Sequence, residues 1–207
     1  MKLLGKLVLK TAAATFSLLV AFALILFGVV SLASPAAMMS FTDSLDMNGV
    51  SAYYSVAVYD RTGEISDLAV AVEKSYYAGH YADAAAYGEK LLDDSSFSEY
   101  CAERDEDTQG NAAIRSSYAQ YAGGIVSSAQ YYNGEKDKSL NTAFDALGQT
   151  FPETNAVSLL ASAAIDKGDV EFCKSILARL EGLSVENVQE QKNLQNFIMK
   201  LQIYCAQ

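Results

Sequence analysis

Tryptophan is absent from the 207 residues, proline occurs only twice and histidine once. So few prolines, in a chain rich in alanine and leucine, leave few obligatory helix breaks, and this favours an all-α fold. The nearest approach to strand-like alternation, YYSVAVY at 53–59, is predicted to be helical like its surroundings. Motifs for phosphate cradling, a zinc protease, heme attachment or a nucleophilic serine are missing. We therefore predict a protein that is not an enzyme and has no cofactor.

Cysteine is scarce as well, and its spacing excludes the common metal sites. Cys101, Cys173 and Cys205 are far apart and form no CxxC pair, which argues against structural zinc. One disulfide with one free thiol stays open as an alternative. We favour isolated small apolar residues, especially for Cys173, which lies in an apolar helical pattern.

Charge is missing from one long segment near the start, where no charged residue occurs between Lys10 and Asp43. Residues 11–33 of this segment are strongly apolar and would form a helix of roughly 34 Å, enough to cross a hydrocarbon core of roughly 30 Å. The run exceeds the roughly 7–15 apolar residues of a secretory signal, so we predict an uncleaved anchor. A signal cleaved near 31–33 or 34–36 is the alternative, with secretion as its consequence.

The charges on the two sides of the apolar segment differ in sign. Lys2, Lys6 and Lys10 precede it, while the remainder holds 12 of the 15 basic residues and all 25 acidic ones. The positive-inside rule then predicts a cytoplasmic tail (1–10), a transmembrane helix (11–33), a linker (34–42) and an extracytoplasmic domain (43–207). An acidic domain disfavours nucleic acid and electrostatic adsorption to anionic lipid. A lysine-led start and a cysteine-poor exported domain are typical of a bacterial cell-envelope protein.

The domain reads as a series of short helices separated by glycine turns. Turn signals occur at RTGE (61–64), AGH (78–80), NGEKD (133–137) and KGD (167–169), where glycine accepts the left-handed conformation that ends a helix. Helical periodicity predicts helices at 43–60, 65–78, 81–94, 112–132, 137–149, 154–166, 169–181 and 186–204.

Three of the turn glycines define an internal register. Gly134 and Gly168 are 34 residues apart, and Gly79 precedes Gly134 by 55, as if a loop at 95–111 had been inserted. Five positions after each glycine stands a small residue that would let the two helices of a pair approach closely: Ala84, Ser139 and Cys173.

This pattern resembles a degenerate tetratricopeptide repeat over about 65–187, most clearly in AGHYADAAAYGEKLL at 78–92. The last predicted helix, 186–204, takes the place of a capping helix. Helical glycines at 88, 123 and 124 depart from the family pattern, and Pro152 alone stands near a family proline position. The resemblance implies stacked helix pairs whose first helices line a concave, partner-binding surface.

Adjacent tyrosines recur at the end of the first helix in two copies, Tyr76–Tyr77 and Tyr131–Tyr132. Tyrosine combines a large ring with a hydroxyl and loses little rotamer entropy, which suits a binding surface. The alternative is that one tyrosine of each pair fills the core between helices. The candidate partner-binding residues are Glu73, Tyr76, Tyr77, Tyr121, Tyr131 and Tyr132. In the third copy the same face carries Asn155, Ser158, Ser162 and Asp166.

Two further features are weaker candidates for a catalytic or metal site. His80, the single histidine, is predicted to flank a turn rather than to act in catalysis. The acidic stretch with Asp105, Asp107, Gln109 and Gly110 partly mimics a calcium loop, although Ser116 stands where the bidentate glutamate belongs. A solvated run of charge is the preferred interpretation.

The sequence therefore predicts a membrane-anchored adaptor that binds a protein or peptide. An anchored or secreted domain that binds a small molecule or glycan in a tyrosine-lined groove, with or without catalysis, is the alternative from another class. A structural spacer without a groove is the third hypothesis.

Overall fold

The computed structural model describes residues 2–107 and 116–206. Within these ranges all regular structure is helical and no strand occurs, which confirms the all-α prediction and the helical assignment of 53–59. The helices are α1 (Lys2–Ala33), α2 (Pro35–Ser44), α3 (Asn48–Thr62), α4 (Ile65–Tyr77), α5 (Tyr81–Leu92), α6 (Phe97–Asp107), α7 (Tyr118–Tyr132), α8 (Lys136–Leu147), α9 (Ala156–Asp166), α10 (Val170–Leu180) and α11 (Val188–Cys205).

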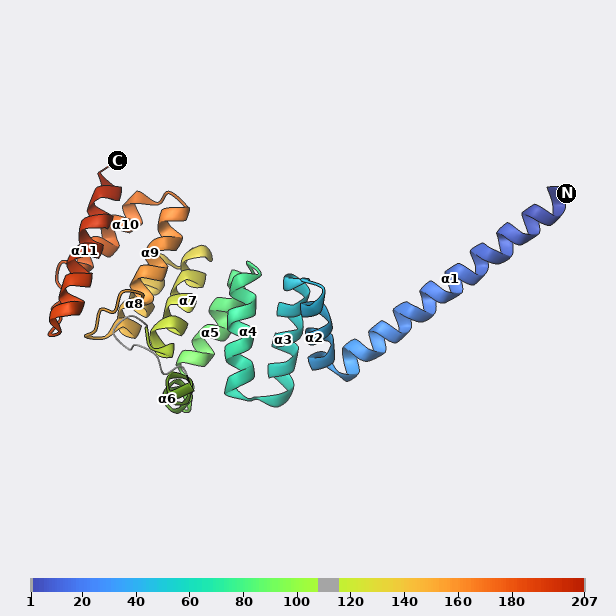
Figure 1. Ribbon diagram of the computed structural model, residues 1–207, viewed down its shortest axis with the longest axis horizontal. Helices are drawn as coiled ribbons and strands as arrows, with labels where there is room; N and C mark the ends of the chain where they lie inside the picture. The colour runs from blue at the N-terminus through green and yellow to red at the C-terminus, as the bar shows by residue number, and fades with distance from the viewer. Residues whose placement is uncertain (1, 108–115, 207) are drawn as a thin grey trace.

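The helices from α2 to α11 stand side by side and follow one another in a single direction, with α6 at the edge of the row (Figure 1). From α2 to α5 and from α6 to α11, each helix contacts the next one in the chain, and α7 contacts α4, α5, α6, α8 and α9. Short turns make successive helices antiparallel, so each pair covers the apolar stripe of the pair before it. The result is an open array rather than a closed bundle.

Three turns of the array share one hydrogen-bonding scheme. Gly79, Gly134 and Gly168 have φ of 78°, 90° and 68°, a region that favours glycine. In each turn the N–H after the glycine bonds to a carbonyl five residues earlier, the bond that closes a Schellman motif. These bonds are His80 to Ser75 (2.8 Å), Glu135 to Gln130 (2.8 Å) and Asp169 to Ala164 (3.0 Å).

The small residues that follow these turns occupy equivalent places. Ala84, Ser139 and Cys173 are each fully buried, as expected for residues that allow two helices to approach closely. The segment 34–42, assigned to a linker from the sequence, lies within α2, which packs on α3. The inserted segment 95–111 contains a helix that periodicity did not predict, α6.

The apolar core is divided into successive layers. One cluster joins α4, α5, α6 and α7 and includes Leu68, Val72 and Val126. A second joins α8, α9, α10 and α11 with the end of α7 and includes Leu160 and Leu201. Because α7 contributes to both clusters, it is the element through which the two halves of the array are packed together.

Glycines inside helices mark the places where α7 crosses its neighbours. A Cβ at Gly88 of α5 would lie 2.4 Å from Val126 of α7. One at Gly123 would lie 2.2 Å from the Cβ of Ala146 of α8, and one at Gly124 2.5 Å from Leu159 of α9. The glycines that depart from the tetratricopeptide pattern are therefore required by close helix approach.

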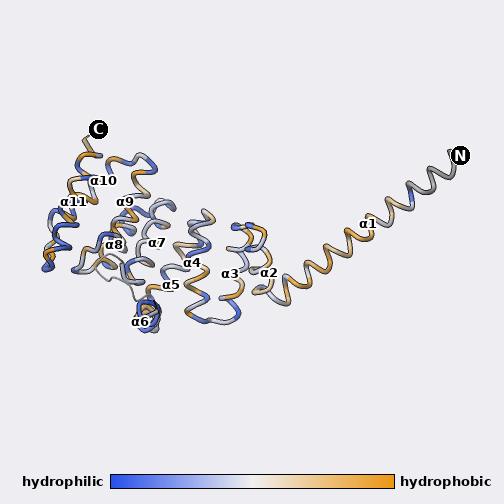
Figure 2. The backbone as a smooth tube through the Cα atoms, viewed as in Figure 1, coloured by the Kyte–Doolittle hydropathy of each residue, from blue (hydrophilic) through white to orange (hydrophobic). Residues whose placement is uncertain are grey.

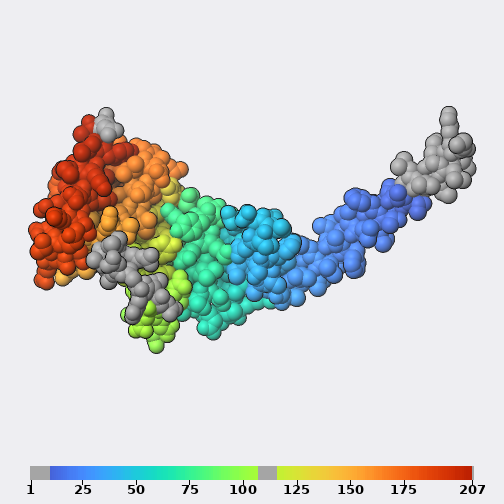
Figure 3. Space-filling model, viewed as in Figure 1, coloured from blue at the N-terminus to red at the C-terminus, as the bar shows by residue number. Residues whose placement is uncertain are grey.

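Helix α1 projects from the α2 end of the array, which is the end opposite α11 (Figures 1 and 3). Its segment Lys10–Ala33 is long and apolar enough to cross a membrane, and none of it is buried within the protein. Figure 2 shows this segment as the longest continuous hydrophobic stretch of the described chain. Length and composition alone are equally consistent with a signal sequence.

Candidate functional site: a tyrosine cluster on the array

The two tyrosine pairs lie at the ends of α4 and α7, and their members differ in exposure. Tyr131 is only 6 % exposed and belongs to the core cluster of α8–α11, whereas Tyr77 is 67 % exposed. Tyr76 and Tyr132 are half-buried. Packing and surface display are therefore divided between the members of each pair.

Ring contacts join the pairs across α4, α5 and α7. Tyr77 meets Tyr76 edge to face with ring centres 5.4 Å apart, and Tyr76 meets Tyr81 at 5.8 Å. Tyr81 then stacks on Tyr132 at 4.3 Å. Such aromatic contacts stabilise by about 0.5–1.5 kcal/mol beyond burial, so each ring is held by its neighbours. Hereafter the tyrosine cluster means Glu73, Tyr76, Tyr77, Tyr81, Tyr118, Tyr121 and Tyr132.

A polar contact set fixes the other edge of the tyrosine cluster. The hydroxyl of Tyr118 donates to Glu73 Oε1 at 2.9 Å, and the hydroxyls of Tyr77 and Tyr121 lie 3.0 Å apart. The guanidinium of Arg104, from α6, lies 5.0 Å from the ring centre of Tyr118. An acid, three hydroxyls and a cation thus meet where α4, α6 and α7 come together.

The hydroxyls of Tyr118 and Tyr121 remain protonated at every physiological pH. Burial raises the pKa of Tyr118 above its usual range, and the neighbouring Glu73 carboxylate raises it further. Burial and the hydrogen bond with Tyr77 raise the pKa of Tyr121 in the same way. These hydroxyls are suited to donating hydrogen bonds, not to acting as anionic nucleophiles.

Tyr131 packs in the core and takes part in a polar contact with Asp169 and Lys136. Its ring stacks on Phe172 at 4.8 Å, and its hydroxyl donates to Asp169 Oδ2 at 3.0 Å. Lys136 pairs with the same carboxylate oxygen. The side chain therefore joins α7 to the start of α10 and is not displayed on the surface.

The predicted third-copy residues separate into two groups. Asn155 is 1 % exposed and caps α9, with Ser158 completing the capping box. Ser162 and Asp166 are exposed. The prediction that Asn155 lies on an open face is wrong, because its side chain accepts the N–H of Ser158 at 2.9 Å inside the fold.

Two members of the tyrosine cluster were missed in the sequence. Tyr81 begins α5, and Tyr118 lies one turn before Tyr121 on α7. The spacing of Tyr118 and Tyr121, three residues apart on a helix, places them on the same face and was an available signal. Tyr81 offered none, because its partner Tyr132 is 51 positions later in the chain.

The remaining sequence candidates lie elsewhere. His80 is exposed at the turn between α4 and α5. Of the calcium-like stretch, Asp105 Oδ1 accepts the backbone N–H of Tyr118 at 2.7 Å, while the Asp107 side chain, Gln109 and Gly110 lie outside the described residues.

All three cysteines are free thiols, which answers the open disulfide alternative. Cys101 and Cys173 are buried, and burial raises the pKa of each thiol to about 11. Both therefore stay protonated and behave as the small apolar residues that the sequence favoured.

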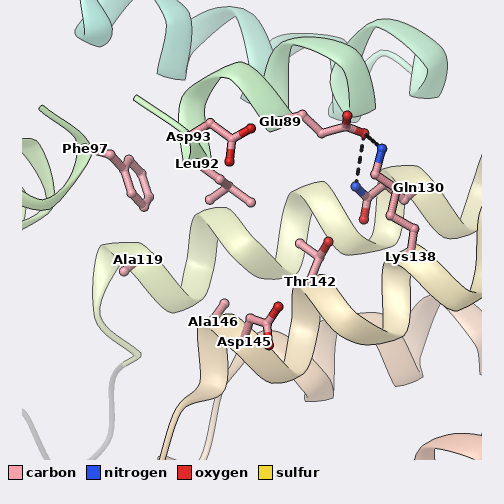
Figure 4. A pocket seen from close by; sticks show the side chains of 10 residues that line it. All are labelled: Glu89, Leu92, Asp93, Phe97, Ala119, Gln130, Lys138, Thr142, Asp145 and Ala146. Atoms are coloured by element: carbon pink, nitrogen blue, oxygen red, sulfur yellow. Dashed lines mark hydrogen bonds and ion pairs between the residues drawn. The ribbon is translucent and has the colours of Figure 1, made fainter. Parts of the chain in front are cut away.

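A cleft of about 490 Å³ opens between α5, α7 and α8 (Figure 4). Lys138 crosses it to pair with Glu89 at 2.6 Å, and Gln130 donates to the same carboxylate at 3.2 Å. The lining is Glu89, Leu92, Asp93, Phe97, Ala119, Gln130, Lys138, Thr142, Asp145 and Ala146. No tyrosine lines this cleft, so it is not the tyrosine-lined groove of the small-molecule hypothesis.

Comparison with protein-family models, with curated proteins and with solved structures gives no significant match.

Proposed function

We propose that the chain is a single-pass membrane protein whose helical array serves as a non-catalytic adaptor, holding a protein or peptide partner on the tyrosine cluster. The observation that carries the proposal is Tyr77, which is 67 % exposed yet held by a ring contact and a hydroxyl contact. A large aromatic side chain displayed in a fixed orientation loses little entropy on binding.

A tetratricopeptide-like architecture is part of the same proposal. Its support is the shared hydrogen-bonding scheme of the turns at Gly79, Gly134 and Gly168, together with the buried small residue five positions after each. Stacked helix pairs of this kind present an extended surface relative to their core, which suits an extended partner segment.

The proposed topology keeps the basic tail in the cytoplasm and the acidic array outside the cytoplasmic membrane. Retention of α1 is supported by its contacts with the array. Ser31 Oγ and the hydroxyl of Tyr54 lie 2.6 Å apart, and Arg61 of α3 donates to the carbonyl of Ala33 at 3.1 Å and to that of Leu32. Cleavage after residue 33 or 36 would remove these contacts.

Site-specific photocrosslinking in the native membrane tests the adaptor role. A benzophenone side chain at position 77 should capture one discrete partner, because this position lies in the tyrosine cluster. The matched control is Met199 of α11, which is 53 % exposed at the far end of the array. Tyr121→Phe should then reduce capture from position 77 with little change in thermal stability, because it removes an exposed hydroxyl and keeps the ring that packs on the core. Equal capture from both positions, or none from position 77, would reject the proposal.

A further inference from the structure

Exposed apolar side chains are concentrated on the first helix pair of the array. Beyond α1, the described residues include eleven exposed large apolar side chains, and five of them fall within residues 41–53. These five define the hairpin patch: Phe41 of α2, Leu45 and Met47 of the turn, and Val50 and Tyr53 of α3. Tyr53 is 69 % exposed, which is as high as the displayed Tyr77. A patch of this kind marks a surface that something apolar covers.

The hairpin patch is attached to α1 by an ordered joint. Arg61 donates to the last carbonyls of α1, and Tyr54 holds Ser31. A cation at a helix C-terminus also interacts favourably with the helix dipole. Pro35, the first residue of α2, is buried against the array. The α2–α3 pair is therefore not free to swing away from the end of α1.

The direction of α2 places its far end on the membrane side of this joint. Figure 1 shows α1 and α2 rising from the joint on the same side, with the α2–α3 turn at the end of α2 remote from it. When α1 crosses a bilayer along its own axis, the turn that carries Leu45 and Met47 lies level with the joint or deeper. The rest of the array extends obliquely away from α1, on the other side of the joint (Figure 1).

The charged residues of the hairpin limit how deeply it can enter the bilayer, but they do not prevent its contact with lipid. The carboxylate of Asp43 is neutralised by Lys74 at 2.6 Å. Asp46, in the turn itself, is exposed and belongs at the level of lipid headgroups. Transfer of tyrosine, phenylalanine and leucine side chains from water to the boundary between headgroups and acyl chains is favourable, and the polar side of the hairpin stays in water there. The attraction is apolar and needs no anionic lipid.

We propose that the α2–α3 hairpin rests in the headgroup–acyl boundary of the bilayer that α1 spans, so that the first helix pair of the array is held against the membrane surface. This inference rests on the proposed membrane span. The occupant of the hairpin patch is thus the surface of the surrounding lipid.

The absence of tryptophan makes the inference directly measurable. Tyr53→Trp and Met47→Trp each create a sole tryptophan within the hairpin patch of the full chain. Met199→Trp is the matched control, since its position is also exposed but lies on α11, at the far end of the array. Phe22→Trp reports on the span itself. Each variant is placed in phosphatidylcholine vesicles, with and without brominated acyl chains, and circular dichroism verifies that its helix content is unchanged.

We expect Phe22→Trp to be quenched most strongly, and Tyr53→Trp and Met47→Trp to be quenched at least about twofold more than Met199→Trp, because burial at the boundary brings the indole near the bromines. If Phe22→Trp is quenched while both patch reporters match Met199→Trp, the hairpin stands off the bilayer and the inference is rejected, while the anchor remains. If Phe22→Trp is not quenched, the anchor fails and the inference fails with it.

Discussion

At the scale of single residues, the two positions of an adjacent tyrosine pair perform different tasks. Tyr131 stacks on Phe172 and bonds to Asp169, whereas Tyr77 displays its ring to solvent between Tyr76 and Tyr121. The division arises because neighbouring side chains on a helix point about 100° apart, so one ring of a pair enters the core when the other leaves it.

Alanine substitutions should separate these tasks. Tyr131→Ala should lower the free energy of unfolding by about 3–5 kcal/mol, as expected when a buried aromatic residue is removed. Tyr77→Ala should lower it by less than about 1 kcal/mol, because an exposed ring adds little burial. Urea titration of the full chain in detergent measures both. Similar losses for the two variants would contradict the division.

The Asp169 carboxylate gives the array a pH-dependent contact. The hydrogen bond from Lys136 holds the pKa of Asp169 below its usual value of 3.8, and the N–H of Phe172 acts in the same direction although burial opposes it. A lowered carboxyl pKa means stability that is present above about pH 4 and is lost as pH falls through the folded-state pKa.

Asp169→Asn keeps a side-chain acceptor for the cap of α10 but removes the charge. We expect a loss of roughly 0.5–1 kcal/mol at pH 7, since Lys136 is largely solvated. The gap from the unsubstituted chain should narrow as the pH is lowered from 7 to below about 4, since the native carboxyl is then increasingly protonated. Thermal melts at the two pH values measure it, and a gap that persists in acid would exclude the ion pair as the cause.

At the scale of elements, α7 is the helix on which the array depends. Gly123 faces Ala146 of α8 and Gly124 faces Leu159 of α9, while Gly88 of α5 faces Val126. Glycine costs about 1 kcal/mol of helix propensity relative to alanine, and here close packing offsets that cost. Replacing glycine by alanine normally stabilises a helix, but at these positions it should destabilise the packing of α7 against its neighbours.

Gly123→Ala should destabilise the chain by about 1–3 kcal/mol, because the new Cβ would meet that of Ala146 and force the helices apart. Gly49→Ala is the control. Position 49 lies in the first turn of α3, and its nearest neighbour, His80 Nε2, would be an ordinary 3.6 Å from the new Cβ. It should be neutral or stabilising. Urea unfolding of both variants measures the difference. The unfolding free energy of Gly123→Ala should lie about 1–3 kcal/mol below that of Gly49→Ala, or further.

The helices themselves could be predicted because periodicity and glycine turns are local signals. Predicted ranges such as 65–78 and 81–94 match α4 and α5 to within two residues. The short α2 lacked a long periodic run, although Pro35 directly after Ser34 is a known start signal for a helix. In α6, only Phe97, Tyr100 and Cys101 form an apolar stripe in an otherwise charged segment.

The details of the tyrosine cluster could not be predicted, because they depend on how two helices cross. The repeat register equates Tyr77 with Tyr132, yet the hydroxyl of Tyr77 meets Tyr121, three turns earlier on α7. Likewise Tyr118 finds Glu73, which lies 45 positions away in the chain. The register gives equivalent positions within each repeat, but the crossing of α4 over α7 decides which side chains touch.

At the scale of the whole molecule, stability should be distributed in layers. The cluster around Leu68 and Val126 and the cluster around Leu160 and Leu201 lie at different places along the row and are joined through α7. In an array of this type each unit is stabilised by its neighbours alone, so opening one end does not require opening the other.

Leu201→Ala and Leu68→Ala test this layering as a reciprocal pair, since each removes one nearly unexposed side chain from one cluster. Each should cost about 2–5 kcal/mol locally. Hydrogen–deuterium exchange of the full chain should then show faster exchange in α10 and α11 for the first variant and in α4 and α5 for the second. A closed bundle would open as one unit, and either substitution would raise exchange in all these helices alike. Opposite and localised patterns would show that the α4–α5 end and the C-terminal end unfold separately, because the packing between them passes mainly through α7.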